Sequence, residues 1–526
     1  MFSRLQLVEA VVVISLLVLI PYILKRLLNL WRLEKAFSKV PYDSEGSVFL
    51  LGQGPRMLRD RGAILDWAAS WTTQKKWKCA RGHIGPGFDR LIALHPDTCK
   101  QVLQKHPKDD LIYHALMPWL GEGLLVANGP RWARSRRLLT PAFHFDIIKS
   151  YIPIYADAAK VMVRRWAQVP EGQSFNVFPY ISLLTLDVVL RCACSHESNC
   201  QDSGTHNPYI AAIYELSDLF IKRQMFFPAH YDWFYALTPN GWRFKRACNL
   251  VHKFSNEVIR TRRMTLEEKK RKGEEVFKGA KKKYLDFIDI LLEARDENGV
   301  GLTDEEIRAE VDTFMFEGHD TTASGIAWAL YNLAKYPDHQ EKCRQEVDEL
   351  FDQKDVLELW VEPWVWSCSL LSHGRDDVRT LKYLAYCIKE SLRLFPPVPV
   401  TGRYLEQPTE IGGHKMPKGT YVISHNYSVH HNPDVWEDPE EFNPLRFTEE
   451  NSKGRSPHAF LAFSAGPRNC IGQEFALNEE KVVIAHILRN FELTLDTEKS
   501  VKKDFLIILR PKDGLYLKLK HRKNSE

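Results

Sequence analysis

The stretch Phe463-Ser464-Ala465-Gly466-Pro467-Arg468-Asn469-Cys470-Ile471-Gly472 decides how this sequence is interpreted. Its glycines and its proline predict a tight loop instead of a helix or a strand. The residues from Gln473 to Leu488 have the apolar spacing of an amphipathic helix, so Cys470 lies just before a helix N-terminus. The dipole and the free N–H groups there favour a thiolate over a thiol. A lone cysteine can equally be a buried structural residue, so other parts of the sequence are needed to distinguish a ligand from a structural cysteine.

The composition is that of a large folded protein. The chain has 526 residues, 44% hydrophobic and 26% charged, with a net charge of +5. The length allows a large core, and so small a charge gives no reason to expect a nucleic acid as partner. The cysteines form no CxxC pair, which argues against a disulfide framework and favours reduced thiols facing the cytosol. Cys192, Cys194 and His196 form one tight group, which we interpret as coincidence because no second group stands at zinc spacing.

The N-terminal segment predicts a membrane anchor. From Leu7 to Leu24 the only charged residue is Glu9, which gives an apolar stretch near the lower limit for a membrane-spanning helix. Basic residues follow this stretch and only Arg4 precedes it, so the bulk of the chain should lie on the cytosolic side. A cleavable signal peptide is the alternative, but small residues do not follow the apolar run.

The segment from Thr303 to Tyr336 predicts a long, buried central helix. Thr303 and Glu306 form a capping box at its start, and Pro337 ends it. Apolar runs on both halves indicate burial, yet the middle reads Glu317-Gly318-His319-Asp320-Thr321-Thr322. Glycine and carboxylates are costly inside a buried helix, so this interruption indicates a functional site.

Other segments complete a mainly α fold with small β-sheets. A second helix is predicted from Asp377 to Phe395, in which Glu390 and Arg393 lie one turn apart and can pair. The alternative for that pair is an exposed ion pair of little energetic value. Strand-like runs occur at 90–94, 402–406, 421–425 and near the C-terminus.

Five motifs make the chain resemble the cytochrome P-450 superfamily over roughly residues 40–520. In chain order they are Trp132 and Arg136 (WxxxR), Gly318, Asp320 and Thr321 (central helix), Glu390 and Arg393 (ExxR), Pro444, Arg446 and Phe447 (PxRF), and Phe463, Gly466, Arg468, Cys470 and Gly472 (FxxGxRxCxG). The resemblance implies a transmembrane anchor (1–26), a linker (27–50), a haem-thiolate monooxygenase domain (51–520) and a C-terminal tail (521–526). Haem b would lie between the central helix and the loop, with Cys470 as the sulfur ligand to the iron.

The resemblance also implies roles for other residues. Trp132, Arg136, Arg403 and Arg468 would contact the haem propionates, and Phe463 would belong to the haem-binding loop. The alternative for Arg136 is a basic surface face, since Arg131, Arg134 and Arg137 are close in sequence and could dock an electron donor. Glu390, Arg393 and Arg446 would form a buried structural triad.

Asp320 and Thr321 resemble an acid–alcohol pair that delivers protons to the oxygen being activated. In this interpretation Gly318 leaves room for that oxygen. The alternative for Thr321 is a hydrogen bond from its hydroxyl to a carbonyl one helical turn back.

A closer similarity is to the long-chain fatty-acid ω-hydroxylase group, family 4. It rests on residues 314–325, on Pro118-Trp119-Leu120-Gly121 and on Arg468-Asn469-Cys470-Ile471-Gly472-Gln473. In that family a glutamate at the position of Glu317 forms an ester with a haem methyl. The resemblance thus implies hydroxylation of fatty-acid or eicosanoid chains at or near the ω carbon. The alternatives are a haem-thiolate isomerase and a haem-binding protein without turnover.

The chain has no nucleotide-binding or flavin motif that we can find, so its electrons must come from a partner. The resemblance implies that this partner is cytochrome P-450 reductase, which uses NADPH, with cytochrome b5 as a second candidate donor. The expected location is the endoplasmic reticulum membrane, with a single span and a cytosolic catalytic domain. The chain departs from the family pattern in a tryptophan-rich insertion at 359–375. We interpret this insertion as dispensable and as the product of an unusual splice form or gene model.

Overall fold

The computed structural model describes residues 20–522 with gaps at 22–23, 26, 50, 86, 197, 199, 203–206, 273–286 and 353–377. The anchor predicted at 1–26 therefore lies almost entirely outside the described residues, as do the insertion predicted at 359–375 and most of the tail at 521–526. Within the described part, no helix is both long enough and apolar enough to cross a bilayer.

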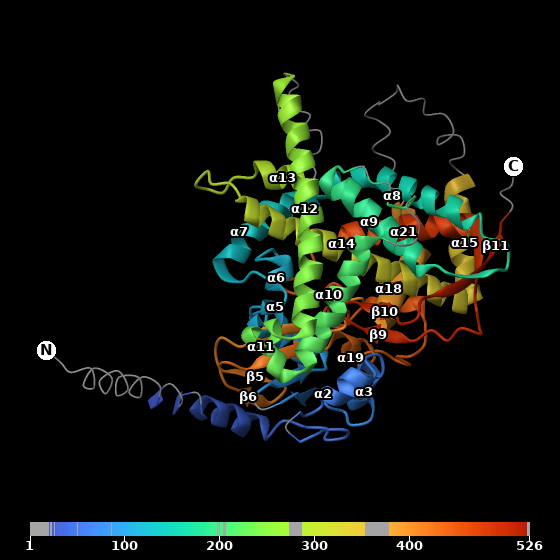
Figure 1. The fold of residues 1–526 in the computed structure, drawn as a ribbon. Coiled ribbons are helices and arrows are strands. Elements are labelled where there is room, and N and C mark those ends of the chain that lie inside the picture. The colour runs from blue at the N-terminus through green and yellow to red at the C-terminus, as the bar shows by residue number, and fades with distance from the viewer. Residues whose placement is uncertain are drawn as a thin grey trace.

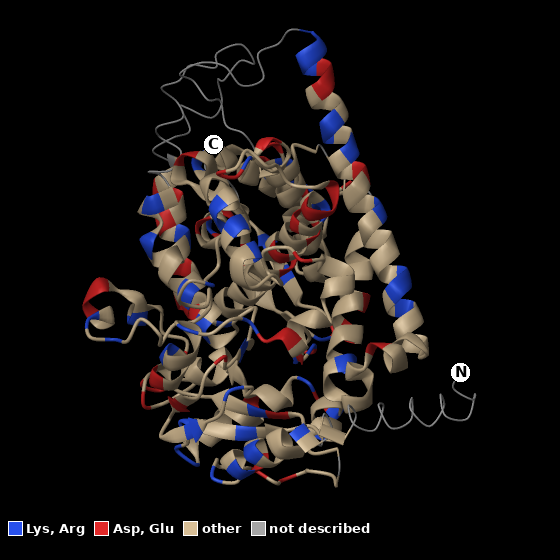
Figure 2. Cartoon of the chain, turned by 90° about the vertical axis from the view of Figure 1, so that its left-hand side faces the viewer, with Lys and Arg blue, Asp and Glu red and all other residues tan. Residues whose placement is uncertain are grey.

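The fold is mainly helical, as predicted (Figure 1). The longer helices are α3 (Ala63–Thr73), α4 (Pro96–Leu103), α7 (Gly129–Leu139), α8 (Phe145–Trp166), α9 (Phe178–Cys194), α10 (Pro208–Met225), α12 (Pro239–Arg271), α14 (Asp304–Lys335), α15 (Pro337–Asp352), α18 (Lys382–Leu394) and α21 (Gln473–Asn490). Shorter ones are α2 (Gly54–Arg59), α5 (Asp110–His114), α6 (Met117–Leu120), α11 (Asp232–Ala236), α13 (Phe287–Glu293), α19 (Asn426–His430) and α20 (Glu449–Ser452), with the 3₁₀ turns η1 (Thr140–Phe143), η2 (Phe227–His230) and η4 (Pro444–Phe447). Basic and acidic residues are interspersed along the elements of the fold in the cartoon of Figure 2, in keeping with the small net charge.

Helix α14 runs through the centre of the molecule (Figure 1). It begins with the predicted capping box, in which the Thr303 hydroxyl accepts from the Glu306 N–H and the Glu306 carboxylate accepts from the Thr303 N–H. Its N-terminal half packs into one hydrophobic cluster and its C-terminal half into another. The polar segment 317–322 lies where these two clusters meet, so the helix carries its functional residues between two rigid halves of the core.

The strands form small sheets at the edge of the helical body. Within the described residues these are a four-stranded sheet in the order β1-β2-β7-β4, a three-stranded sheet in the order β3-β11-β8, and the hairpins β5-β6 and β9-β10. Their bounds are β1 (Cys79–His83), β2 (Asp89–Ala93), β3 (Ser174–Asn176), β4 (Thr401–Tyr404), β5 (Thr409–Ile411), β6 (His414–Met416), β7 (Tyr421–Ser424), β8 (Phe491–Leu495), β9 (Lys503–Phe505), β10 (Leu509–Pro511) and β11 (Tyr516–His521). Strands β2, β4 and β7 confirm the runs predicted at 90–94, 402–406 and 421–425.

Two segments differ from the sequence interpretation. The linker predicted at 27–50 contains a helix over residues 27–37 and packs onto the domain through the buried side chains of Phe37 and Val40. Helix α21, predicted to be amphipathic, buries even its charged residues Glu479 and Glu480, because α8, α14, α15 and α18 surround it. Burial raises the pKa of Glu480 to about 8 and that of Glu479 well above its usual range, so both carboxyl groups favour the protonated form.

Candidate active site

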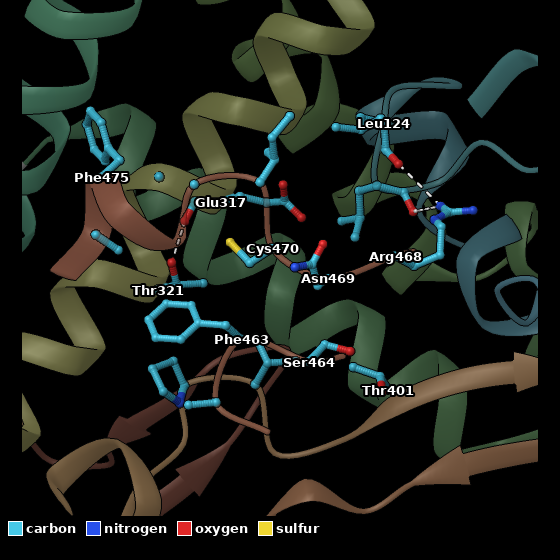
Figure 3. Close-up of a pocket in the computed structure, with 18 of the residues that line it drawn as sticks. Leu124, Glu317, Thr321, Thr401, Phe463, Ser464, Arg468, Asn469, Cys470 and Phe475 are labelled. Atoms are coloured by element: carbon cyan, nitrogen blue, oxygen red, sulfur yellow. Dashed lines mark hydrogen bonds between the residues drawn. The ribbon is translucent and has the colours of Figure 1, made fainter. Parts of the chain in front are cut away.

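An internal cavity lies between the loop of Cys470 and the middle of α14 (Figure 3). Its volume is about 220 Å³, counted as the space open to the centre of a water molecule. Apolar side chains from both halves of the core line most of it, among them Leu124, Val189, Phe314, Val398 and Phe475. Of the predicted site residues, the cavity brings together Trp132, Arg136, Glu317, Thr321, Arg403, Phe463, Arg468 and Cys470, whereas Asp320 is not among its lining residues.

The loop that carries Cys470 is shaped by its backbone. Ser464 and Gly466 have φ angles of 59° and 75°, in the left-handed region that favours glycine. A Cβ atom on Gly466 would also lie 2.5 Å from the carbonyl oxygen of Leu103, so the loop packs too closely there for a larger residue. The Cys470 N–H donates to the Phe463 carbonyl over 3.0 Å and closes the turn. The sulfur of Cys470 is thereby placed in the cavity (Figure 3).

In the polypeptide alone, the thiol form of Cys470 is favoured. Although the Cys470 side chain presents accessible surface to the cavity, the protein around it desolvates the thiol and raises its pKa to about 12, with a smaller contribution from the negative charge of Glu317. The N–H of Gly472 and the nearby cations lower this pKa, as the position before α21 predicted, but desolvation is the larger effect. A thiolate at Cys470 therefore needs additional positive charge in the cavity, which a metal ion bound to the sulfur supplies.

Four basic side chains gather at one edge of the cavity: Lys108, Arg136, Arg403 and Arg468, here called the edge cluster. Arg403 is 1% exposed and Lys108 is 8% exposed. Burial and the charge of Arg403 lower the pKa of Arg468 to about 10, and burial and the charge of Arg468 lower that of Lys108 well below its usual range. Like charges are thus held together in a desolvated place, at a cost that an anionic ligand would offset.

The hydrogen bonds of the edge cluster go mainly to neutral groups. Arg468 donates to Asn128 Oδ1 (3.0 Å) and to the Ala127 carbonyl (2.8 Å), Lys108 Nζ to the Leu125 carbonyl (2.7 Å), Arg136 to the Asn469 carbonyl (3.0 Å), and Arg403 to its neighbour's carbonyl (2.9 Å). Within the described residues, Arg403 Nε and the nearby hydroxyls of Thr401 and Ser464 have no partner. Trp132 lies against Arg468, whose guanidinium carbon is 4.6 Å from the ring centroid.

The sequence analysis missed Lys108. Its local sequence resembles that of the exposed Lys105 and matches no motif. Only the tertiary fold brings it to the cavity, where residue 108 forms an isolated β-bridge with Arg403. A single sequence contains no local pattern that would have found it.

Of the α14 residues that line the cavity, Glu317, Gly318 and Thr321 make different contacts. Glu317 lines it, and burial raises the pKa of this carboxyl, although Lys108 and Arg468 lower it. The Thr321 hydroxyl also lines it and donates to the Glu317 carbonyl over 2.5 Å, which is the helix-internal bond considered as the alternative. Gly318 allows close packing, because a Cβ atom there would lie 2.9 Å from Val189 of α9.

Asp320 is directed away from the cavity. Its carboxylate is completely buried and forms a two-point ion pair with the Arg510 guanidinium, with 3.0 Å between Arg510 Nε and Asp320 Oδ1. Arg510 lies in β10 and packs on the ring of Tyr214 at 3.9 Å. The charged groups that act on Glu317 are basic and belong to the cavity edge. The two carboxyls therefore lie in separate environments.

A second group of buried charges, here called the triad, lies between α18 and η4. Arg393 makes a two-point bond to Glu390, with both N–O distances at 2.8 Å, and Arg446 Nε lies 3.3 Å from Glu390 Oε1. Arg393 also donates to the carbonyls of His430, Pro439 and Glu441, and the Asn443 N–H donates to Glu390. Glu390 and Arg393 are 0% exposed, so the surface ion pair considered as the alternative is excluded.

The basic residues around Arg136 have acidic partners of their own. Arg131 pairs with Glu122 and Glu306, Arg134 with Asp296 and Glu306, and Arg137 with Glu297. These pairs tie α7 to the segment before α14. They leave this face with less free positive charge than the sequence indicates.

Comparison with known proteins identifies the family. The family model for Cytochrome P450 matches residues 83–519. The chain belongs to the cytochrome P450 family. It is accordingly a haem-dependent monooxygenase that receives electrons from NADPH through a reductase.

Similar proteins extend this finding. The ultra-long-chain fatty acid omega-hydroxylase of Homo sapiens is 46% identical over 444 residues, which cover 83% of this chain and 80% of that protein. Cytochrome P450 4F11 of Homo sapiens is 47% identical over 445 residues, covering 83% and 81%. The leukotriene-B4 omega-hydroxylase 3 of Mus musculus is 46% identical over 445 residues, again covering 83% and 81%.

The cavity of this P450 fits a haem. Haem b is a flat apolar macrocycle with two carboxylates on one edge, and the cavity is apolar with a cluster of cations on one edge. The partnerless Arg403 Nε and the hydroxyls of Thr401 and Ser464 are the donors that such carboxylates would use. The sulfur of Cys470 lies in the same cavity.

Proposed function

We propose that this P450 hydroxylates fatty-acid or eicosanoid chains at or near the ω carbon. One observation carries the proposal: a single cavity combines the Cys470 sulfur, a cationic edge and an apolar remainder facing Glu317 and Thr321. Haem iron with a thiolate ligand activates dioxygen and inserts one of its oxygen atoms into a C–H bond. The names of the relatives, which include fatty-acid and leukotriene omega-hydroxylases, supply the substrate class.

The chain's own residues would hold the cofactor and the substrate. Cys470 would ligate the iron, and its loop would keep water from the sulfur. Trp132, Arg136, Arg403 and Arg468 would bind the propionates as charge-assisted donors, and Lys108 would join them. Phe463 would pack against the ring system. The apolar lining would hold an alkyl chain and admit its terminal carbon to the reacting position.

Asp320 and Thr321 would divide the supply of protons between them. Thr321 faces the cavity and can exchange its bond to the Glu317 carbonyl for one to the reacting oxygen or to a water. Asp320 has no access from the cavity lining and is held by Arg510, so it would contribute by polarising the hydroxyl next to it in sequence or by relaying protons through a buried water.

The location we propose is the endoplasmic reticulum membrane, with a single N-terminal span and a cytosolic catalytic domain. The apolar stretch from Leu7 to Leu24 and the basic residues after it support this orientation. Exposed Trp233, Leu237 and Trp242 add apolar surface in and after α11, of the kind that enters a lipid interface. Cytochrome b5 is a second candidate electron donor beside the reductase.

The test is turnover by the full-length protein with reductase, NADPH and a panel of fatty acids and eicosanoids. We expect product oxidised at or next to the terminal carbon, together with the thiolate-type carbon monoxide difference spectrum. Cys470→Ala should abolish both the spectrum and the turnover. Turnover of a peroxide substrate without NADPH would support an isomerase, and a normal spectrum without any product would support a haem-binding protein without turnover.

A further inference from the structure

A second hollow lies at the junction of α2, α3, α10 and the β9–β10 hairpin, elements that neighbour one another in the lower central part of Figure 1. Its volume is about 180 Å³ on the measure used for the cavity. Five basic and three acidic residues line it: Arg59, Arg61, Lys222, Lys503 and Lys512, with Asp60, Asp218 and Asp504. The lining therefore carries an excess of positive charge.

The frame of this hollow is rigid. Arg61 makes a two-point bond to Asp504 of β9, with N–O distances of 2.9 and 3.1 Å, and a third bond of 2.7 Å to Asp218 of α10. At Gly62, a Cβ atom would lie 2.1 Å from the carbonyl oxygen of Lys503, so the start of α3 packs directly on β9. Three elements distant in sequence are thus fixed around one partly buried guanidinium.

Most charges of the hollow are already neutralised, but two cations are not. Asp218 is bound by Arg61 and by Lys222, and Asp60 caps the start of α3 by accepting from the Gly62 and Ala63 N–H groups. Arg59 and Lys512 are exposed, and neither has an ion-pair partner among the residues that the structure describes. These two side chains are free to bind an anion, of which a carboxylate or a phosphate would fit the guanidinium.

The β9–β10 hairpin extends from the hollow to residues that pack around the active-site cavity. Its open end carries Lys503 and Asp504 and is followed by Lys512, all lining the hollow. At the other end, Ile508 packs in the same apolar cluster as the cavity residues Leu124 and Phe314.

Two further bonds fix this inner end of the hairpin. The Leu509 N–H donates to the carbonyl of Pro397, which lines the cavity, over 2.9 Å. The carbonyl of Leu509 accepts from the Ser324 hydroxyl of α14 over 2.5 Å. The hairpin is therefore held against the cavity wall at one end and forms part of the hollow at the other.

We propose that Arg59 and Lys512 hold the carboxylate of the substrate in this hollow, while its chain follows the hairpin and places its ω end in the cavity. The proposal rests on the proposed function and names the feature that selects its substrates. Strand β9, residues 503–505, spans about 10 Å, and the turn at 506–508 closes the hairpin at its inner end. An alkyl chain advances about 1.3 Å per carbon, so roughly eight carbons are needed to cover the length of this strand before the cavity is reached. Only acids with longer chains would reach both sites.

The experiment compares acids with their methyl esters in the haem-loaded, full-length enzyme. The variant Arg59→Gln/Lys512→Gln is titrated with a long-chain fatty acid, its methyl ester and a medium-chain acid, with the substrate-induced change in the haem absorption spectrum as readout. We expect the Kd of the long-chain acid to rise about tenfold, as for the loss of two exposed ion pairs, and the other two to stay within about twofold. A matched control, Lys415→Gln/Lys453→Gln, removes two exposed cations elsewhere and should change none of them.

Each other outcome has a definite meaning. Equal losses for the acid and its ester, or no loss for either, overturn the carboxylate site. If the double variant loses affinity for vesicles containing phosphatidic acid while the acid titration is unchanged, the hollow binds lipid phosphate and the proposal is likewise overturned. If the native enzyme oxidises acid and ester equally well, the proposed function stands without this site. If it oxidises neither, the proposed function itself fails.

Discussion

Two groups of buried charges in this P450 differ in how completely they are satisfied. In the triad of Glu390, Arg393 and Arg446, one carboxylate lies between two guanidiniums, and main-chain carbonyls accept the remaining donors of Arg393. In the edge cluster, Lys108, Arg403 and Arg468 repel one another and mostly donate to neutral carbonyls and amides.

The difference separates a structural element from a ligand site. A group in which each cation contacts the carboxylate needs no further ligand, and removal of that carboxylate would leave buried charges without their partner. A group with excess charge and unused donors needs an anionic ligand, which in the proposed function would be the pair of haem carboxylates. The two groups should accordingly respond to mutation in opposite ways.

The largest effect is expected for Glu390→Gln. This change leaves two buried guanidiniums with no carboxylate, at a cost of about 3–5 kcal/mol in the free energy of unfolding. The carbonyls of His430 and Pro439 would lose their fixed donor, and haem incorporation should fall because the cysteine loop follows this region. Denaturant unfolding and the haem-to-protein ratio measure the effect. Glu449→Gln, at an exposed position of α20, is the control, and equal behaviour of the two variants would show that the triad is dispensable.

Lys108→Met tests the edge cluster and should act in the opposite direction on the haem-free protein. The substitution removes a like charge from a desolvated group, so the haem-free chain should be as stable as before or more stable. Haem should leave about tenfold faster, because a donor to a carboxylate is lost. Transfer of haem to apomyoglobin measures the rate of haem loss, and denaturant unfolding of the haem-free protein measures its free energy of unfolding. The exposed Lys105→Met should change neither, and a destabilised haem-free Lys108→Met would mean that the lysine is structural.

Thr321→Ala should alter coupling more than binding. NADPH consumption should continue, while the product formed per NADPH falls several-fold and hydrogen peroxide rises, because the hydroxyl that supplies protons is gone. Thr321→Ser retains the hydroxyl and should restore coupling. Thr322→Ala, which removes a neighbouring cavity hydroxyl without a partner among the described residues, is the matched control. If only protein stability changes, the bond to the Glu317 carbonyl is the whole role of Thr321.

Local patterns predicted the parts of the site that depend on nearby residues. The capping box of α14, the pairing of Glu390 with Arg393 one turn later and the tight loop before α21 can all be recognised from neighbouring positions. The partners supplied by distant segments could not be predicted this way. Arg510 meets Asp320 across 190 positions, and Lys108 reaches the cavity through a bridge to Arg403. The desolvation that raises the pKa of Cys470 likewise comes from the whole fold and leaves no local pattern in the sequence.

Glu317 belongs to neither group, and its replacement has the smallest expected effect on the rate of turnover. Among the residues that the structure describes, only Glu317 and Glu480 bring carboxyl groups to the cavity lining. The charges that act on Glu317 come from Lys108, Arg468 and Arg136 of the edge cluster. It can therefore serve as their counter-ion, or it can form the ester to a haem methyl that the family 4 resemblance implies. Once haem carboxylates occupy the cluster, a counter-ion is redundant and the buried carboxylate becomes costly. An ester removes both its charge and its need for donors.

The two roles predict different products of turnover. In the ester, a carboxylate oxygen replaces one hydrogen of the methyl, a two-electron oxidation that turnover supplies, so the link should accumulate with NADPH and reductase. Denaturing chromatography after turnover should show haem eluting with the native polypeptide and apart from Glu317→Ala, while Glu480→Gln, the other cavity carboxyl, should behave like the native protein. A looser haem in Glu317→Ala should also shift product from the ω carbon toward its neighbour, with turnover changed by no more than about twofold. If haem separates freely from the native chain after many turnovers, the ester is excluded and Glu317 acts as a counter-ion of the edge cluster. In that case Glu317→Gln should destabilise the haem-free protein, because it removes a negative charge from a group with excess positive charge. Lys108→Met should not destabilise it.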